Sequence, residues 1–146
     1  MANFRKIFFD TAPLIYFLGE NSPLKKDMDK IFFEVLSDRY QIFTSSVTCE
    51  EYLTYNYRNH NEEGVNYFWK FIHNFNVNVR VIDNAVAVEA AKLRAEYKDF
   101  KTMDALQLAA AICSGCDLFL TNSTQLKSFD KIFCVTVEEW KTFSKE

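Results

Sequence analysis

Short apolar runs alternate along this chain with longer stretches in which apolar residues recur at helical spacing. The apolar runs predict strands near residues 5–9, 41–44, 79–82, 118–121 and 132–135. A continuous run such as Ile7-Phe8-Phe9 is typical of a strand covered on both faces, as occurs in parallel sheets. The alternation of strands and helices predicts an α/β fold with a central, mostly parallel sheet of four to five strands.

The predicted helices cover residues 23–38, 46–58, 65–75, about 84–93, and 103–112. Ser22-Pro23 is a helix-opening pair, because serine caps a helix and proline fits its first position. Asn84 is a candidate cap for the fourth helix. The last helix is apolar nearly all round, so we expect it to lie buried against the sheet. Since no linker or repeat is visible, residues 1–146 are expected to form a single domain.

Composition restricts the function mainly by exclusion. The net charge is −3 without a polybasic run, so charge alone does not indicate nucleic-acid binding. The three glycines are too scattered to build a phosphate-binding loop or a dinucleotide fingerprint. No apolar stretch reaches the length of a membrane span, and we expect a cytoplasmic protein without a membrane partner. The cysteines fit that compartment as free thiols, and Cys113 and Cys116 lack the second pair that a zinc site needs.

Acids beside apolar elements are the candidates for chemistry. Asp10 directly follows the first apolar run, and sites in open parallel sheets form outside the carboxyl ends of the strands. Asp10 is therefore either a helix cap or a working acid. Asp104 begins the buried helix, where the helix dipole favours an acid by about 0.3–1 kcal/mol. An acid in so apolar a helix must nonetheless face water or a cation, and a metal ion in a cleft would meet that need.

Two more predicted strands are followed by polar residues. After the second strand, Glu50 and Glu51 are both candidates, and spacing alone does not choose between them. Thr48 and Glu51 have the spacing of a capping box, which would make this glutamate structural. The fourth strand ends in Thr121-Asn122-Ser123, and the alternative to a functional role is a turn in which Ser123 or Thr124 caps a short helix.

In order and context these segments resemble the PIN domain, especially the VapC-like toxin ribonucleases. The resemblance is carried by Phe9-Asp10-Thr11 with Leu14-Ile15-Tyr16, Ser45-Ser46-Val47-Thr48-Cys49-Glu50-Glu51, Met103-Asp104-Ala105-Leu106-Gln107-Leu108-Ala109, and Leu120-Thr121-Asn122. It implies a three-layer α/β/α domain with a metal-dependent nuclease centre in which Asp10 and Asp104 bind the metal. The family's second acid lies three residues after the threonine of its motif, which selects Glu51 over Glu50.

The chain departs from the family at Ser123, where the family often has aspartate. Serine supplies no negative ligand, although it can hold a water. We expect a site of Asp10, Glu51 and Asp104, in which Glu51 either completes the metal shell or orients the attacking water as a base. It is accompanied by Thr11, Thr121, Asn122 and Ser123. Mg²⁺ or Mn²⁺ prefers such oxygen ligands, and the ion would activate a water for attack on a phosphodiester. The resemblance implies products with 5′-phosphate and 3′-hydroxyl ends.

An acidic protein can bind RNA if a metal ion joins its carboxylates to phosphate and local cations help. The candidate cations are Arg58, Lys101 and Lys127, followed by Lys70, Arg80, Arg94 and Lys98. Tyr52, Tyr55 and Tyr57 are candidates for base stacking, although aromatic residues at helical spacing more often pack in a core or an interface. The aromatic block 67–72 is a candidate homodimer face or antitoxin groove, with core packing as the alternative.

We therefore expect a metal-dependent endoribonuclease that hydrolyses RNA phosphodiester bonds and serves as the toxin of a toxin–antitoxin pair. The alternative, raised by Ser123, is a degenerate PIN scaffold that binds RNA or protein without cutting. An aspartate-nucleophile phosphatase is disfavoured because Ala12 stands where that class has its second aspartate. A receiver domain is disfavoured because adjacent acids are missing after the first strand.

Overall fold

A computed structural model of the chain describes residues 5–19 and 21–144. Its strands are β1 (Lys6–Phe9), β2 (Gln41–Ser45), β3 (Asn78–Arg80), β4 (Leu118–Thr121) and β5 (Phe133–Thr136). Its helices are α1 (Thr11–Leu18), α2 (Lys25–Ser37), α3 (Ser46–Arg58), α4 (Glu62–Asn74), α5 (Asn84–Glu96), α6 (Thr102–Cys113), the 3₁₀ helix η1 (Thr124–Ser128) and α7 (Trp140–Ser144). The expected domain also includes residues 1–4, 20 and 145–146, which lie outside the described residues.

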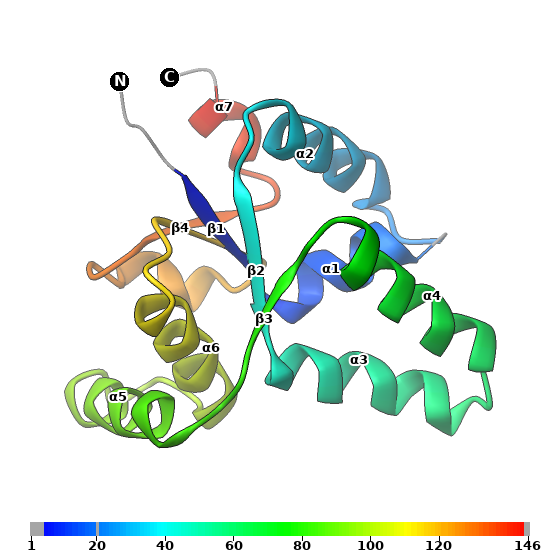
Figure 1. Ribbon diagram of the computed structural model, residues 1–146. Helices are drawn as coiled ribbons and strands as arrows, with labels where there is room; N and C mark the ends of the chain where they lie inside the picture. The colour runs from blue at the N-terminus through cyan, green and yellow to red at the C-terminus, as the bar shows by residue number, and fades with distance from the viewer. Residues whose placement is uncertain (1–4, 20, 145–146) are drawn as a thin grey trace.

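The strands form one all-parallel sheet in the order β3-β2-β1-β4-β5 (Figure 1). This confirms the predicted α/β fold and the parallel sheet. The chain moves outward from β1 through β2 to β3, and then returns to the other side of β1 for β4 and β5. β1 and β4 therefore flank a topological switch point. In open α/β sheets, ligands bind in the crevice outside the carboxyl ends of the strands at such a point.

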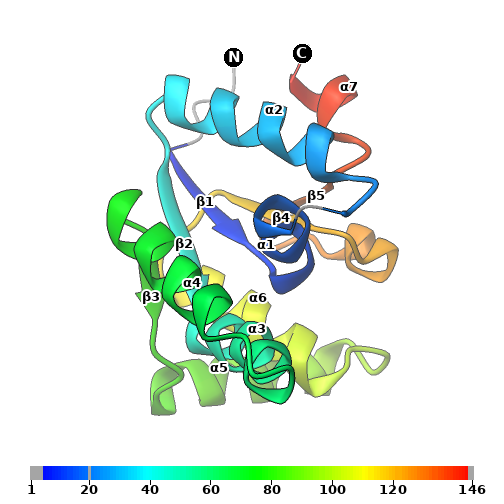
Figure 2. The same ribbon diagram turned by 90° about the vertical axis from the view of Figure 1, so that its right-hand side faces the viewer.

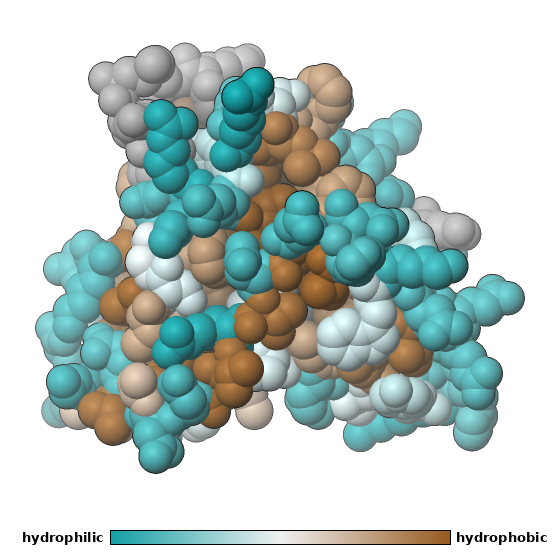
Figure 3. Space-filling model, viewed as in Figure 1, coloured by the Kyte–Doolittle hydropathy of each residue, from teal (hydrophilic) through white to brown (hydrophobic). Residues whose placement is uncertain are grey.

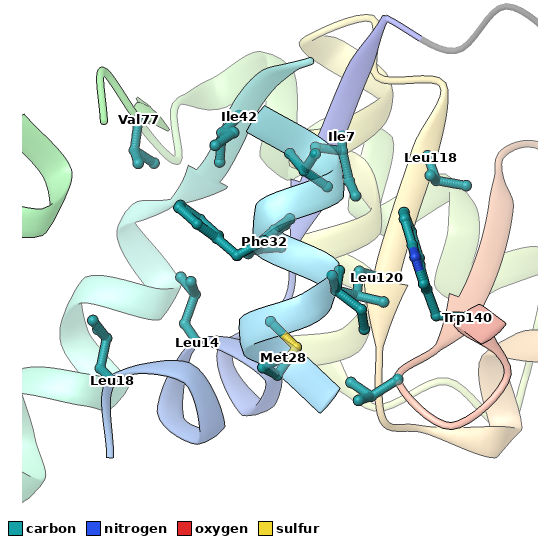
Figure 4. Close-up of a cluster of buried hydrophobic side chains, with 14 of the residues drawn as sticks. Ile7, Leu14, Leu18, Met28, Phe32, Ile42, Val77, Leu118, Leu120 and Trp140 are labelled. Atoms are coloured by element: carbon teal, nitrogen blue, oxygen red, sulfur yellow. The ribbon is translucent and has the colours of Figure 1, made fainter. Parts of the chain in front are cut away.

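Helices cover both faces of the sheet, which confirms the three-layer arrangement (Figure 2). On one face, Ile7, Ile42 and Leu120 of the sheet pack with Phe32 of α2 and Trp140 of α7 (Figure 4). All of these side chains are buried, so this face holds an extensive apolar core. The core fixes the position of β1 and thereby of the residue that follows it.

The other face of the sheet is covered by α5 and α6. Phe8 and Phe119 of neighbouring strands stack there with their ring centroids 5.2 Å apart. The small side chains Ala105, Ala109 and Ala110 of α6 are buried in the same cluster, as its apolar sequence predicts. Because α6 carries Asp104 in its first turn, this packing also fixes where Asp104 lies.

The starts of α2, α4 and α5 differ from the prediction, because other residues precede or cap these helices. α4 begins at Glu62, capped by Asn61, rather than at residue 65. Ser22 forms a turn in which its hydroxyl accepts a hydrogen bond from Leu24 N (3.2 Å), and α2 begins only at Lys25. α5 is capped by Asp83 rather than by Asn84, because the Asp83 carboxylate accepts a hydrogen bond from the third helical residue (3.0 Å). These changes move helix ends but not the topology.

Apolar side chains also reach the surface of the molecule. Figure 3 shows them over β2 and β3, between more hydrophilic helical regions. Other large apolar or aromatic side chains are exposed on α2, α3 and α4, among them Phe33, Tyr55, Tyr67 and Trp69. None of the helices within residues 5–19 and 21–144 combines the length and the apolarity needed to cross a bilayer.

The corner between α3 and α4 depends on a glycine. The buried Asn56 donates to Tyr52 O (3.0 Å) and accepts from Asn61 Nδ2 (3.1 Å), so its side chain is held in place. A Cβ added at Gly64 would overlap Asn56 Oδ1. Gly64→Ala is therefore expected to lower the free energy of unfolding in urea by about 1–2 kcal/mol. The exposed Asn66→Ala on the same helix is the control, and a Gly64→Ala protein as stable as this control would contradict the prediction.

Candidate active site

The site is built where β1 ends. Asp10 N continues the sheet ladder by donating to Leu120 O (2.9 Å), and α1 begins at the next residue. The Asp10 carboxylate caps α1 by accepting a hydrogen bond from Thr11 N (2.9 Å) through Oδ1. Asp10 is therefore a helix cap, and its second oxygen also faces the end of β4. Figures 1 and 2 show α1, α3 and α6 starting near this end of the sheet.

Side chains from two other elements hold the Asp10 carboxylate. Thr121 Oγ1, at the end of β4, donates to Oδ2 (2.8 Å), and Gln107 Nε2, on α6, donates to Oδ1 (3.2 Å). Burial raises the pKa of Asp10 and the nearby Asp104 raises it further, whereas the hydrogen bonds from Thr121, Thr11 and Gln107 lower it. The net direction is upward, so the ionised carboxylate lacks a compensating positive charge.

Asp104 lies in the first turn of α6 and is partly buried. Burial raises the pKa of this carboxyl, and the charge of Lys101 partly opposes the effect. Among residues 5–19 and 21–144, no hydrogen-bond donor lies against the Asp104 carboxylate. Asp104 is thus close enough to Asp10 to influence its ionisation, yet its own oxygens are open to a ligand.

The structure separates the two candidate glutamates of α3. Glu51 Oε1 accepts a hydrogen bond from Thr11 Oγ1 (2.7 Å), so this carboxylate joins the residues around Asp10. Glu50 Oε1 accepts a hydrogen bond from Thr54 Oγ1 (2.9 Å) of its own helix, on an exposed surface. The geometry therefore favours Glu51 as the member of the site.

The capping-box interpretation of Thr48 and Glu51 is wrong. Ser45 caps α3, because its hydroxyl accepts a hydrogen bond from Val47 N (3.1 Å). Thr48 lies inside the first turn of the helix and is fully buried. Its hydroxyl is 3.1 Å from Thr11 Oγ1, so it belongs to the polar network of the site.

The chemistry of the donors fits a hard divalent cation. Within residues 5–19 and 21–144, no three Asp, Glu, His or Cys side chains form a ready metal cluster, and Glu51 is turned toward Thr11. Mg²⁺ is usually bound through one or two carboxylates, completed by water and substrate phosphate. The carboxylates of Asp10 and Asp104 offer oxygen atoms of the kind that such a cation prefers, and burial raises the pKa of both groups. A cation there would relieve the repulsion.

The end of β4 supports Asp10 through one of its three polar residues. Thr121 is buried and bonds Asp10 directly, as described above. Ser123 contributes through its backbone, because Ser123 N donates to Thr121 Oγ1 (3.1 Å). Asn122 points elsewhere and donates through Nδ2 to Tyr16 Oη (2.8 Å). Asp117 accepts hydrogen bonds from backbone nitrogens at the start of β1, at the opposite end of the sheet.

The candidate RNA contacts differ in their surroundings. Lys101 is the residue before α6 and acts electrostatically on Asp104. Lys127 forms an ion pair with Glu139 (3.0 Å), and Arg58 is an exposed residue at the end of α3.

Among the tyrosines considered for base stacking, Tyr52 stacks on Phe68 with ring centroids 4.8 Å apart and so packs against the core. Tyr55 and Tyr57 are exposed. The block 67–72 divides in the same way, with Phe68 and Phe71 buried and Tyr67 and Trp69 exposed.

Gln107 is the residue of this site that the sequence analysis missed. It is only 2% exposed, and it bonds Asp10, Thr11 (3.2 Å), Thr48 (2.8 Å) and Ser45. The available signal was a polar amide inside an apolar helix, three residues after Asp104. Residues three apart share a helix face, so this spacing places the amide on the side of the acid.

Comparisons with known proteins match the fold that carries this site. The family model of the PIN domain matches residues 7–132. The chain is similar to a solved structure of VapBC2 from Rickettsia felis bound to a promoter DNA fragment, at 15% identity and a TM-score of 0.73, covering 90% of this chain and 98% of that one. A comparison with curated proteins gives no match.

Two further solved structures extend the likeness. DNA-bound VapBC from Salmonella typhimurium is 18% identical with a TM-score of 0.73, covering 91% of this chain and 98% of that one. VapC20 from Mycobacterium tuberculosis, described as a toxin that cleaves the sarcin-ricin loop, is 15% identical with a TM-score of 0.61, covering 86% and 90%. At these identities the structural likeness bears on the fold alone.

Asp10→Asn is expected to raise the unfolding temperature of the metal-free protein at pH 7 by a few degrees. The folded-state pKa of Asp10 lies above its ordinary value, so the ionised form loses stability as pH rises from the unfolded value through the folded one. The amide avoids this loss and still caps α1. Thermal unfolding in chelator across pH 4.5–8 should show the difference growing with pH. An equal midpoint at every pH would contradict the prediction, with the exposed Glu50→Gln as control.

Proposed function

Because this chain belongs to the PIN domain family, we propose that it is a metal-dependent endoribonuclease that hydrolyses RNA phosphodiester bonds with Mg²⁺ or Mn²⁺. The observation that carries the proposal is the partly buried Asp10 carboxylate at the switch point of the sheet, whose pKa is raised by burial and by the nearby Asp104. A helix cap needs only one carboxylate, whereas a divalent cation is commonly bound by two carboxylates, so the presence of Asp104 beside Asp10 favours metal binding.

In this proposal Asp10 and Asp104 hold the divalent ion. When bound, the ion lowers the pKa of a coordinated water and offsets the charge that develops on the phosphate. Thr121 and Gln107 keep the two oxygens of Asp10 in fixed directions through their hydrogen bonds. Such outer partners orient ligands and usually affect metal affinity strongly.

Glu51 has the role of orienting the attacking water and accepting its proton. Thr11 Oγ1 holds this carboxylate by the 2.7 Å hydrogen bond, so it remains at the same edge of the sheet as Asp10. Glu51 is exposed, as suits a group that must meet substrate and water. Lys101, beside Asp104, and the exposed Arg58 are proposed to bind the RNA backbone. Lys127 is a weaker candidate because Glu139 already pairs with it.

We further propose that the chain is the toxin of a toxin–antitoxin pair. The VapBC structures that it resembles are complexes, and VapC20 is described as a toxin that cleaves an RNA loop. A cytoplasmic location fits an RNA substrate. The exposed Tyr67 and Trp69 of α4 remain candidates for contact with an antitoxin or with a second copy in a homodimer.

The alternative function is a PIN scaffold that binds RNA or protein without cutting. It is favoured by Ser123, which offers only a hydroxyl and a backbone nitrogen where the family often has a fourth acid, and by the lack of a ready three-acid cluster within the part of the chain that the structure describes.

Cleavage of total RNA with added Mg²⁺ or Mn²⁺ tests the enzyme. Asp10→Asn and Asp104→Asn should abolish cleavage, and Glu51→Gln should slow it about a hundredfold or more because the proton acceptor is lost. Glu50→Gln is the matched control, since it removes the neighbouring charge of the same helix and should leave the rate unchanged. Retained cleavage in both aspartate variants would defeat the proposal.

Calorimetry with Mn²⁺ separates the enzyme from the scaffold. The wild-type protein should give a saturable heat that Asp10→Asn lacks. Ser123→Asp should tighten Mn²⁺ binding, because it adds a carboxylate beside Thr121, the residue that bonds Asp10. No metal-dependent heat, together with no cleavage at any metal concentration, would favour the scaffold instead.

A further inference from the structure

A single buried amide connects the acids of the site. Gln107 is one helical turn beyond Asp104 on α6, and its side chain lies among hydroxyl groups from β2, α1 and α3. An apolar side chain of similar volume would suit the surroundings of α6 better if Gln107 served only to fill space. A buried amide persists without cost only where its polar atoms are paired.

The direction of the Gln107 amide follows from its partners. Ser45 Oγ donates to Oε1, while Nε2 faces the Asp10 carboxylate at 3.2 Å. The reversed orientation would place the amide oxygen against the Asp10 carboxylate, where two acceptors would repel each other. Nε2 therefore points toward Asp10, and one of its two hydrogens is donated to Oδ1.

The second hydrogen of Nε2 is connected to Glu51 through the hydroxyls of Thr48 and Thr11. Nε2 lies 2.8 Å from Thr48 Oγ1 and 3.2 Å from Thr11 Oγ1. Thr11 donates its only hydroxyl hydrogen to Glu51 Oε1, so toward Thr48 and Gln107 it can act only as an acceptor. Thr48 then donates to Thr11 and accepts from Gln107. By either route, the hydrogen bonds run in one direction from the amide to Glu51.

We propose that Gln107 is a positioning residue that orients both carboxylates at once, Asp10 directly and Glu51 through the hydroxyls of Thr48 and Thr11. This inference rests on the function proposed above. Gln107 touches neither substrate nor metal ion in this arrangement. It transmits the rigid packing of α6, the helix that carries Asp104, to the acids of β1 and α3, so that the three acids keep a fixed mutual arrangement.

The two amide hydrogens allow a test that needs neither metal nor activity. In ¹H–¹⁵N spectra of the metal-free protein, both Gln107 side-chain protons should be protected from exchange. Asp10→Asn should shift mainly one of them, and Glu51→Gln mainly the other, because the two branches are separate. Glu50→Gln is the control and should shift neither. If neither side-chain proton signal of Gln107 shifted in Glu51→Gln, the proposed hydrogen-bond connection from Gln107 to Glu51 would be overturned.

Mn²⁺ calorimetry measures the consequence for the site. Gln107→Met removes both donors at similar volume and should weaken Mn²⁺ binding about tenfold or more, the usual effect of losing an outer partner of a ligand. In the Glu51→Gln background Gln107→Met should weaken Mn²⁺ binding by a smaller factor, because the connection from Gln107 to Glu51 is already lost. The inference would be overturned if Gln107→Met bound Mn²⁺ as tightly as the wild type. It would also be overturned if the affinity losses of Gln107→Met and Glu51→Gln simply added in the double variant.

Ser45→Ala distinguishes positioning from a merely structural role. It removes the α3 cap and the partner of Oε1, so the unfolding temperature should fall, yet both donors of Nε2 remain. We expect its Mn²⁺ affinity to stay within about twofold of wild type. A loss equal to that of Gln107→Met would mean that fold stability alone governs binding, and would overturn the proposal.

The wild-type protein separates this inference from the proposed function. A wild type that neither binds Mn²⁺ nor cleaves RNA would overturn the function and, with it, the positioning role. A wild type that does both, while Gln107→Met binds and cleaves equally well, would overturn the inference alone.

Discussion

The partly buried carboxylate of Asp10 is the constraint around which the site is arranged. This carboxylate is partly withdrawn from water at the end of β1, and the described residues compensate for its charge with hydrogen bonds rather than with a paired cation. Burial of a carboxylate is costly unless it is paired or binds a metal. The fold supplies donors from β4, α1 and α6, and each of these donors requires its element to lie at the switch point.

The topology explains how distant segments of the chain reach one another. β1 and β4 are neighbours although more than a hundred residues separate them in sequence, and their carboxyl ends bring Asp10 and Thr121 together. α6 packs on one face of the sheet through its buried alanines, and its N-terminal part carries Asp104 and Gln107 near Asp10. The packing of α6 therefore both fills the core and fixes the positions of Asp104 and Gln107. The same residues contribute to stability and to the proposed function, so removal of the Asp10 charge is expected to affect both.

The acidic composition of the protein is compatible with the proposed function, in which a metal ion would assist RNA binding. A net charge of −3 offers no general attraction to a polyanion. A cation bound to the carboxylates would provide positive charge at one place, and a phosphate group could bind to it directly. Lys101, next to Asp104, adds a fixed charge at the same place. Ser123 adds no negative charge to the side of the site near β4, so in the proposed function the affinity for the ion would depend on the remaining acids and on how firmly they are held.

The sequence by itself determined the strands, the parallel sheet and the positions of Asp10 and Asp104, because these depend on local hydrophobic period and on the rule that sites follow strand ends. Tertiary structure decided the rest. Spacing alone left Glu50 and Glu51 open and the family resemblance selected Glu51, but only the fold brings the Glu51 carboxylate to Thr11 and leaves Glu50 bonded to its own helix. Thr48 has the spacing of a capping box, but Ser45 is nearer to the helix start and takes that role. Gln107 gains its importance from partners on three other elements, and no local pattern encodes a contact between residues that are distant in the chain.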